Sequence, residues 1–325
     1  MDQIRVGFLG AGGMGQHHLK AVAQMPEVRV AAVCDISATL AEAAARRYQA
    51  RSYQDYHDML EKEDLDALYV AIPPFAHSDA EIIAAKKGIH LFVEKPVALT
   101  LEKAHEVQAA IQRAGIISAA GYVLRYYQAP TLMRRFLGDK TIAMIVVTRW
   151  GGVPGTPWWG VMSRSGGQLV EQTTHQVDLV RYITDKEITS VYADYALRVM
   201  GSRENWDIPD VYSVAMKLED GTPISLTTAC TMYRGGGQSA INFLLDGYLV
   251  EMEVTKIRTS PEANPDLDGE YGEEIDIDRA FIDAVRLNDK SLVRSDYADA
   301  VKTLAVTLAA NESARAGKPV KVPLD

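Results

Sequence analysis

Short apolar runs alternate with segments of helical periodicity through the first third of the chain. Runs of this length, rich in β-branched residues, are typical of strands buried on both faces of a parallel sheet. We expect strands at residues 4–9, 28–34, 67–71, 90–93 and 116–120, with helices at 13–25, 38–48, 77–87 and 101–113. Ser37 and Thr100 are predicted N-caps, and Gly88 and Gly115 follow predicted helix ends. This alternation predicts a doubly wound α/β domain over residues 1–121.

After Gly121 the pattern changes to longer β-forming runs joined by tight turns. Asp220-Gly221 and Asp246-Gly247 are strong signals for β-hairpins. Helical periodicity persists at residues 128–137, 167–183, 278–287 and 296–316. Residues 122–325 are therefore predicted to form an α+β domain with a mostly antiparallel sheet, in which residues 260–272 form a mobile loop.

Composition narrows the class of protein. The chain has 325 residues, 47% of them apolar, and a formal net charge of −9. At about 150 residues per domain the length suggests two domains, and we do not expect so acidic a chain to bind nucleic acid or an anionic membrane. Cys34 and Cys230 lie far apart, no basic leader is visible, and no apolar run approaches the ~20 residues of a membrane span. We therefore expect a reduced, cytoplasmic protein that acts on a small molecule.

A glycine-rich sequence, Gly10-Ala11-Gly12-Gly13-Met14-Gly15, follows the first predicted strand and opens the first helix. In such a loop Gly10 permits the tight turn, Gly12 lets a pyrophosphate approach the helix N-terminus, and Gly15 lets the helix pack closely on the strand. Asp35 follows Gly15 by twenty residues, at the end of the second strand, where a carboxylate can accept hydrogen bonds from a ribose. The alternative is a glycine-rich turn without a ligand, but the pattern favours a dinucleotide site.

Asp35 also bears on which dinucleotide binds. Its carboxylate repels a 2′-phosphate, and the next residues, Ile36 and Ser37, bring no arginine to neutralise one. NAD is therefore preferred, while NADP stays open because a carboxylate at this position can rotate away.

Two further motifs carry chemistry. Glu94-Lys95-Pro96 follows a buried strand, so Lys95 can reach the crevice beyond the strand ends, unless the motif is a solvated turn. In the predicted helix 167–183, Glu171, His175 and Asp178 are spaced to share one face. An imidazole between carboxylates can accept a proton near neutral pH, and the alternative is a structural histidine. A Glu171–His175 metal pair finds no third ligand, so we expect no metal ion.

Together these motifs resemble the Gfo/Idh/MocA oxidoreductase family, named for glucose-fructose oxidoreductase and inositol dehydrogenase. The resemblance covers nearly the whole chain and includes residues 71–77 (Ala-Ile-Pro-Pro-Phe-Ala-His) and 311–314 (Asn-Glu-Ser-Ala). It implies an N-terminal Rossmann domain that binds a nicotinamide dinucleotide, and a C-terminal domain with an open, mainly antiparallel sheet. Such sheets associate face to face, so the resemblance implies a homodimer or homotetramer.

The resemblance also implies roles for individual residues. The lysine of the Glu-Lys-Pro motif, here Lys95, hydrogen-bonds the reacting hydroxyl, and the helix histidine, here His175, is the general acid or base. The expected reaction is hydride transfer between nicotinamide and a secondary alcohol of a sugar, inositol or related polyol. Many family members carry Asp four residues before the histidine, whereas this chain has Glu171, so inositol specificity does not carry over.

The candidate residues fall into three groups. The catalytic candidates are Lys95, His175 and Glu171. The cofactor-binding candidates are Gly10, Gly12, Gly13, Met14, Gly15, Asp35, Ile36, Ile72, Pro73, His77, Glu94 and Lys95. The substrate-binding candidates are Lys95, Arg125, Tyr126, Trp158, Trp159, Glu171, His175 and Asp178, because aromatic rings stack on sugars and arginine binds hydroxyls. Core packing for the tryptophans, an ion pair for Arg125 and capping for His77 are the alternatives. His18 and the remaining histidines are expected to be structural or solvated.

Two other functions remain open at this point. One is a glycoside hydrolase or lyase in which tightly held NAD oxidises the sugar transiently and is then regenerated. The other is a non-enzymatic regulator that binds a dinucleotide, although such a protein needs neither Lys95 nor His175. Net NADH formation separates the dehydrogenase from both.

Overall fold

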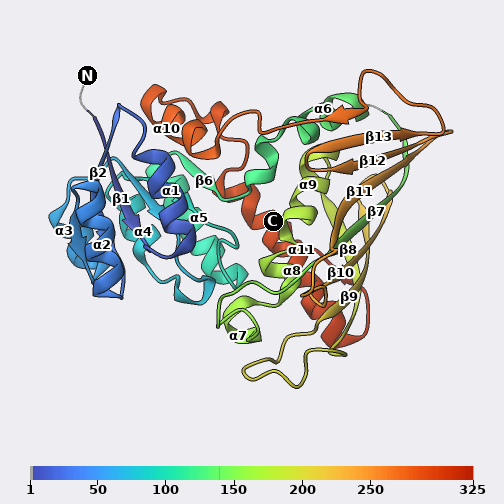
Figure 1. Ribbon diagram of the computed structural model, residues 1–325, viewed down its shortest axis with the longest axis horizontal. Coiled ribbons are helices and arrows are strands. Elements are labelled where there is room, and N and C mark those ends of the chain that lie inside the picture. The colour runs from blue at the N-terminus through green and yellow to red at the C-terminus, as the bar shows by residue number, and fades with distance from the viewer. Residues whose placement is uncertain (1–2, 139, 325) are drawn as a thin grey trace. The chain divides into compact units, whose positions relative to one another are not determined.

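The computed structural model describes residues 3–138 and 140–324, and the chain divides into two compact units (Figure 1). The first contains Met1–Tyr122 and Ile275–Val301, and the second contains Val123–Glu274 and Lys302–Asp325. The chain therefore returns to the first unit late in the sequence, which the sequence pattern does not predict. Within the described ranges, no helix combines the length and the hydropathy needed to cross a bilayer.

The first unit contains a six-stranded parallel sheet in the order β3-β2-β1-β4-β5-β6, so the predicted doubly wound sheet is confirmed. Its strands are β1 (Ile4–Leu9), β2 (Val28–Cys34), β3 (Arg51–Tyr53), β4 (Ala67–Val70), β5 (His90–Val93) and β6 (Ser118–Ala120). Its helices are α1 (Gly13–Val22), α2 (Ala38–Tyr48), α3 (Tyr56–Lys62), η1 (Pro74–Ala76), α4 (Ala80–Lys86), α5 (Leu101–Ala114), α10 (Ile277–Leu287) and η3 (Lys290–Leu292).

Three local differences from the predicted elements have physical reasons. The sequence pattern misses β3 because the strand has three residues and none is buried, and it misses α3, which has only seven residues. The predicted helix 77–87 begins only at Ala80, because Pro74 opens a separate 3₁₀ turn and the backbone at His77 is extended (φ −62°, ψ 131°).

The strand register brings four loops of the first unit to one edge of the sheet. Leu9 pairs with both Cys34 and Val70, and Val70 pairs with Val93, so the last residues of β1, β2, β4 and β5 form a row. Because these strands are parallel, the segments that follow them all leave at the carboxyl edge. The glycine loop, Asp35, residues 71–77 and the Glu94-Lys95-Pro96 motif are these segments.

The second unit contains a nine-stranded sheet in the order β14-β13-β12-β11-β7-β10-β9-β8-β15. One pair, β7–β10, is parallel and the others are antiparallel, which confirms the predicted mostly antiparallel sheet. The strands are β7 (Ile142–Trp150), β8 (Ile188–Ala196), β9 (Val211–Leu218), β10 (Pro223–Ala229), β11 (Gln238–Leu245), β12 (Leu249–Glu253), β13 (Lys256–Ser260), β14 (Gly269–Glu270) and β15 (Val320–Lys321). The short β14 lies inside the predicted loop 260–272.

Both predicted hairpin turns are present in this sheet. Gly221 and Gly247 have φ values of +91° and +82°, and their turns connect β9 to β10 and β11 to β12. The helices of the unit are η2 (Val123–Tyr126), α6 (Gln128–Leu137), α7 (Met162–Ser165), α8 (Gln168–Glu171), α9 (Thr174–Thr184) and most of α11 (Tyr297–Ala316), in which the boundary between the units falls.

The predicted helix 167–183 is interrupted, which corrects one expectation. The amide of Thr173 donates to the carbonyl of Gln168, five residues earlier, at 3.0 Å, and this wide turn separates α8 from α9. The side chains of Gln168 and Thr173 both reach Oγ1 of Thr228 on β10, each at 2.8 Å. Because of the break, the prediction that Glu171 shares one helical face with His175 and Asp178 is wrong, since Glu171 ends α8.

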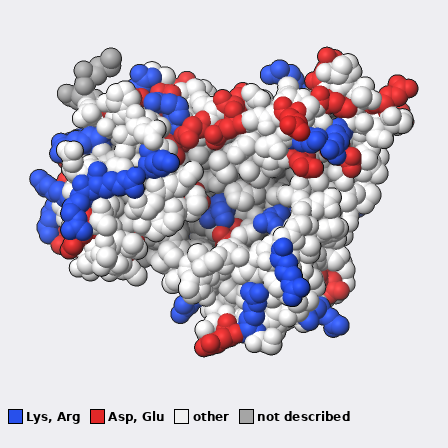
Figure 2. Space-filling view, in the orientation of Figure 1, with Lys and Arg blue, Asp and Glu red and all other residues white. Residues whose placement is uncertain are grey.

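On the face shown in Figure 2, positive and negative side chains are interspersed between broad uncharged areas. The net charge of −9 is therefore not gathered into a single patch on this face.

A buried ion pair fixes η2 to α9 within the second unit. Nε and Nη2 of Arg125 donate to the two carboxylate oxygens of Asp178 at 2.7 and 2.6 Å, and the side chains of both residues are at most 5% exposed. Thr303 of α11 donates to the same carboxylate at 3.1 Å, and the Arg125 guanidinium lies over the Tyr182 ring. The pair therefore ties together three separate segments around α9, the helix that carries His175.

Removing one member of this pair should destabilise the second unit strongly. Arg125→Met leaves the Asp178 carboxylate buried without its guanidinium, and we expect the free energy of unfolding to fall by about 3–5 kcal/mol. Arg134→Met is the matched control, because its guanidinium also lies over Tyr182 but pairs with the exposed Asp185; we expect a loss of about 1 kcal/mol or less. Urea denaturation measures both, and equal losses would contradict the assignment.

Candidate functional site

The glycine loop after β1 is shaped by close packing of the chain on itself. Gly10 has a φ of +101°, and a Cβ there would lie 2.3 Å from the carbonyl oxygen of Ala71. A Cβ on Gly15 would lie 2.1 Å from the carbonyl oxygen of Gly10. Both contacts are closer than atoms allow, so these two positions require glycine whether or not a ligand binds.

The middle of the same loop borders open space instead. A Cβ on Gly12 or on Gly13 would meet no atom within 4 Å, and Met14 is half exposed. Close packing therefore does not explain the glycines at these two positions, and the backbone there is open to the approach of a ligand. Because α1 begins at Gly13, a phosphate here would meet backbone N–H groups and the positive end of the helix dipole.

The Asp35 carboxylate is held in place by two backbone amides. Oδ2 accepts a hydrogen bond from the amide of Ala11, and Oδ1 accepts one from the amide of Ser37, each at 2.8 Å. Each oxygen retains a lone pair for a further donor. Ile36, beside it, is 92% exposed. The geometry therefore presents a fixed acceptor next to the open part of the glycine loop.

The segment after β4 contains Ile72 and Pro73, which are partly exposed, and His77, whose side chain is 3% exposed. Nδ1 of His77 lies 2.5 Å from Oε1 of Glu81, which is also buried. Because the side chain is enclosed, direct contact between His77 and a cofactor is not favoured by this geometry. The pair instead connects the segment to the first turn of α4.

The segment after β5 holds Glu94 and Lys95. Lys95 is half-buried, and its amide donates to Oε2 of Glu94 at 3.1 Å. The other oxygen of Glu94 lies 3.0 Å from Nε2 of His18 on α1. No local sequence signal could have identified His18, because its second carboxylate partner, Asp278, lies 260 residues away.

In the second unit, Glu171 and Trp159 form a pair. Nε1 of Trp159 donates to Oε2 of Glu171 at 2.5 Å, and Trp159 is 1% exposed in an apolar cluster with Ile208 and Cys230. A ring enclosed in this way has no exposed face for sugar stacking, so the geometry favours core packing for Trp159. Trp158 packs against the same cluster and is only partly buried.

His175 lies in the first turn of α9 and is half-buried. Close to the break before α9, Nη2 of Arg149 donates to Oε1 of Gln172 at 2.7 Å, and burial lowers the pKa of Arg149. Arg125 and Asp178 are nearly inaccessible and pair with each other, and Tyr126 is 1% exposed. These three residues therefore support α9 and η2, while His175 and Trp158 retain exposed surface.

Two observations concern what else the described residues could bind. Over residues 3–138 and 140–324, no group of three or more His, Cys, Asp or Glu side chains is arranged to hold a metal ion.

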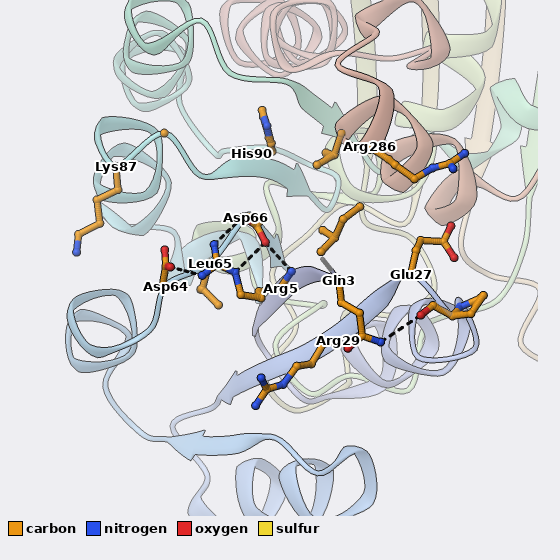
Figure 3. Close-up of a pocket in the computed structure, with 14 residues that line it drawn as sticks. Gln3, Arg5, Glu27, Arg29, Asp64, Leu65, Asp66, Lys87, His90 and Arg286 are labelled. Atoms are coloured by element: carbon orange, nitrogen blue, oxygen red, sulfur yellow. Dashed lines mark hydrogen bonds and ion pairs between the residues drawn. The ribbon is translucent and has the colours of Figure 1, made fainter. Parts of the chain in front are cut away.

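A groove of about 1290 Å³ opens at the amino-terminal edge of the parallel sheet (Figure 3). There Arg5 is paired with Asp64 and Asp66, and ligands of doubly wound sheets bind at the opposite edge.

Comparison with known proteins agrees with this geometry. Residues 4–122 match the model of an oxidoreductase family with an NAD-binding Rossmann fold, and residues 133–247 match the GFO/IDH/MocA C-terminal domain. The chain is 27% identical over 338 residues to scyllo-inositol 2-dehydrogenase (NAD(+)) of Bacillus subtilis (strain 168), covering 98% of this chain and 96% of the relative. It is 28% identical over 223 residues to the uncharacterized oxidoreductase YrbE of the same organism, covering 67% of this chain and 65% of that relative.

A solved structure shows the same fold over the full length. The WlbA dehydrogenase from Bordetella pertussis, in complex with NADH and UDP-GlcNAcA, matches with a TM-score of 0.85 and 24% identity, covering 99% of this chain and 100% of that chain. With both units matched by models of one family, the chain belongs to the Gfo/Idh/MocA family of NAD-binding oxidoreductases.

Proposed function

We propose that the protein is an NAD-dependent dehydrogenase that transfers hydride between nicotinamide and a secondary hydroxyl of a sugar, inositol or related polyol. The observation that carries the proposal is the carboxyl edge of the parallel sheet. There the open part of the glycine loop, the anchored Asp35 and Lys95 follow β1, β2 and β5, whose last residues lie in one row with that of β4. The open glycine loop and Asp35 fit a dinucleotide, and Lys95 adds a positive charge at the same edge.

The residues of the first unit would bind the cofactor as follows. The backbone at Gly12 and Gly13 and the N-terminus of α1 would hold the pyrophosphate. Asp35 would accept hydrogen bonds from the adenosine ribose diol. Because two amides hold the Asp35 carboxylate, it is not free to swing away from a 2′-phosphate, which supports NAD over NADP. When bound, the nicotinamide supplies the hydride acceptor or donor.

Lys95 and His175 would act on the reacting hydroxyl. The Lys95 ammonium would donate a hydrogen bond to the substrate oxygen and stabilise the negative charge that develops there. His175 would take the hydroxyl proton in oxidation and return it in reduction. Glu171, which Trp159 holds, and Asp178, which Arg125 holds, would position the segments on either side of His175.

The substrate class and the assembly rest on further support. The relative named scyllo-inositol 2-dehydrogenase favours a ring polyol or sugar as substrate. Along β9, Tyr212, Val214 and Met216 are buried while Ser213 and Ala215 are exposed, so one face of the sheet remains open. We propose that this face joins two copies in a homodimer or homotetramer.

The reaction is tested by absorbance at 340 nm with purified protein, NAD or NADP, and a panel of inositols, aldoses, sugar acids and glycosides. We expect a substrate-dependent rise with NAD. Cleavage of a chromogenic glycoside without net NADH would instead favour the redox-assisted hydrolase or lyase. Dinucleotide binding without any turnover would favour a regulator, and either result would contradict the dehydrogenase.

The two catalytic roles are tested by Lys95→Ala and His175→Ala. Each should lower kcat by roughly a hundredfold or more, because a charge-stabilising donor or a proton acceptor is lost, while the Kd for NAD changes little. Lys103→Ala and His105→Ala on α5 are matched controls at partly or fully exposed positions and should keep the wild-type kcat. Wild-type turnover in His175→Ala would refute the proposal that His175 accepts the hydroxyl proton.

Cofactor preference is tested by Asp35→Asn. The amide would turn a donor toward the N–H of Ala11 or Ser37 and would remove the charge that repels a 2′-phosphate. We expect affinity for NAD to fall by roughly tenfold to a hundredfold, with a smaller loss or a gain for NADP. Calorimetric titration gives the ratio of the two Kd values, with the exposed Asp58→Asn as control. An unchanged ratio would show that Asp35 does not select the cofactor.

A further inference from the structure

The His18 imidazole is buried between two carboxylates from distant parts of the first unit. Its Nδ1 lies 2.7 Å from Oδ1 of Asp278, and its Nε2 lies 3.0 Å from Oε1 of Glu94. The His18 side chain is 2% exposed, and those of Glu94 and Asp278 are 9% and 0% exposed. Three elements meet at this imidazole: α1, the end of β5 and the start of α10.

Aromatic rings enclose the imidazole on its remaining sides. The ring centroids of Phe92 and Tyr69 lie 4.9 and 5.6 Å from that of His18, and Phe281 of α10 packs edge-on against both rings. His17, the preceding residue, presents its ring edge at 5.6 Å. Water is thereby kept from the ion pairs, which strengthens them electrostatically.

When both carboxyl groups are ionised, the two contacts require a proton on each ring nitrogen of His18. A carboxylate only accepts, whereas a neutral imidazole donates from one nitrogen, so only the imidazolium satisfies both partners. Burial lowers the pKa of His18, but the hydrogen bonds to Asp278 and Glu94 outweigh burial and raise it to about 10. Burial raises the pKa of Asp278, and the hydrogen bond from His18 limits that rise. The Tyr69 hydroxyl faces the same carboxylate, and Asp276, the N-cap residue of α10, adds a repulsive charge.

Glu94 transmits this contact to Lys95. While His18 holds Oε1, Oε2 accepts the amide N–H of Lys95. The backbone at Gly121 also packs directly against the Glu94 carboxylate. A Cβ at Gly121 would lie 2.5 Å from Oε1 and 2.7 Å from Oε2 of Glu94. The position of the Lys95 backbone therefore depends on a carboxylate that is fastened by His18.

We propose that His18 is a positioning residue for Lys95, acting through Glu94, and that Asp278 holds His18 in turn. The proposal rests on the proposed role of Lys95 in hydride transfer. It gives the late return of the chain to the first unit a function, because Asp278 and Phe281 belong to α10 and complete the enclosure of His18. On this proposal α10, although remote in sequence, supports the position of Lys95.

Kinetics separate positioning from general destabilisation. His18→Gln should lower kcat by about tenfold to a hundredfold, because a small misplacement of a catalytic group costs this much, while the KM for NAD stays within about twofold. In a Lys95→Ala background the same substitution should have an effect below about threefold, since the group that it positions is gone. His105→Gln, the same change at an exposed histidine on α5, should leave kcat unchanged.

Two outcomes would overturn the proposal. One is a folded His18→Gln variant with wild-type kcat, and the other is a loss that multiplies fully with that of Lys95→Ala. If His18→Gln does not fold, Asp278→Asn replaces it, because this isosteric change leaves Glu94 bound to His18 and should lower kcat by a smaller factor. Wild-type kcat in Asp278→Asn would then refute the link to α10.

A measurement independent of turnover keeps the two proposals distinct. In ¹⁵N-histidine NMR spectra of the full chain, one imidazole should remain doubly protonated up to about pH 9 and lose this signature in His18→Gln. The stability that His18 contributes should be complete below its ordinary pKa of 6.5 and decline as pH rises toward 10. An imidazole at His18 that titrates near 6.5 would refute the inference, whereas wild-type turnover in Lys95→Ala would refute only the proposed function.

Discussion

The parallel register of β1, β2, β4 and β5 is the constraint on which the candidate site depends. Because the last residues of these strands lie in one row, four loops that are separated in sequence leave the sheet at one edge. The strand pairing alone places the glycine loop, Asp35 and Lys95 at that edge, whichever side chains the loops carry. The side chains then determine how firmly each loop is held there.

Two kinds of contact hold these loops. Asp35 is held by backbone amides close to it in the fold, whereas Lys95 is held through Glu94 and a buried imidazolium. The first needs only a βαβ unit, and the second needs the α10 segment that returns from the end of the chain. In the second unit the buried Arg125–Asp178 pair likewise holds α9 in place, by joining it to η2. In the His18 and Arg125 networks each buried charge faces an opposite charge from another element, which offsets part of the cost of burial.

Local sequence patterns predicted the fold well and the second half of the site less well. The predicted doubly wound and antiparallel sheets are both present. The helix break before Thr174 was missed, because helical periodicity cannot register a wide turn that is stabilised by Thr228 from a distant strand. For the same reason the sequence placed Glu171 beside His175 on one face. For Trp159 the sequence leaves sugar stacking and core packing open, because a tryptophan has the same local sequence pattern in a core and in a pocket.

By itself, the sequence determined what lies within one or two consecutive elements: the glycine positions from Gly10 to Gly15, the spacing to Asp35 and the hairpin turns. These features follow from local sterics and hydrogen bonding, which short-range patterns encode. Only the tertiary structure decided that His18 is buried between two carboxylates and that α10 belongs to the first unit. A histidine and an aspartate 260 residues apart carry no local signal, because their contact exists only after the sheet and α10 have packed together.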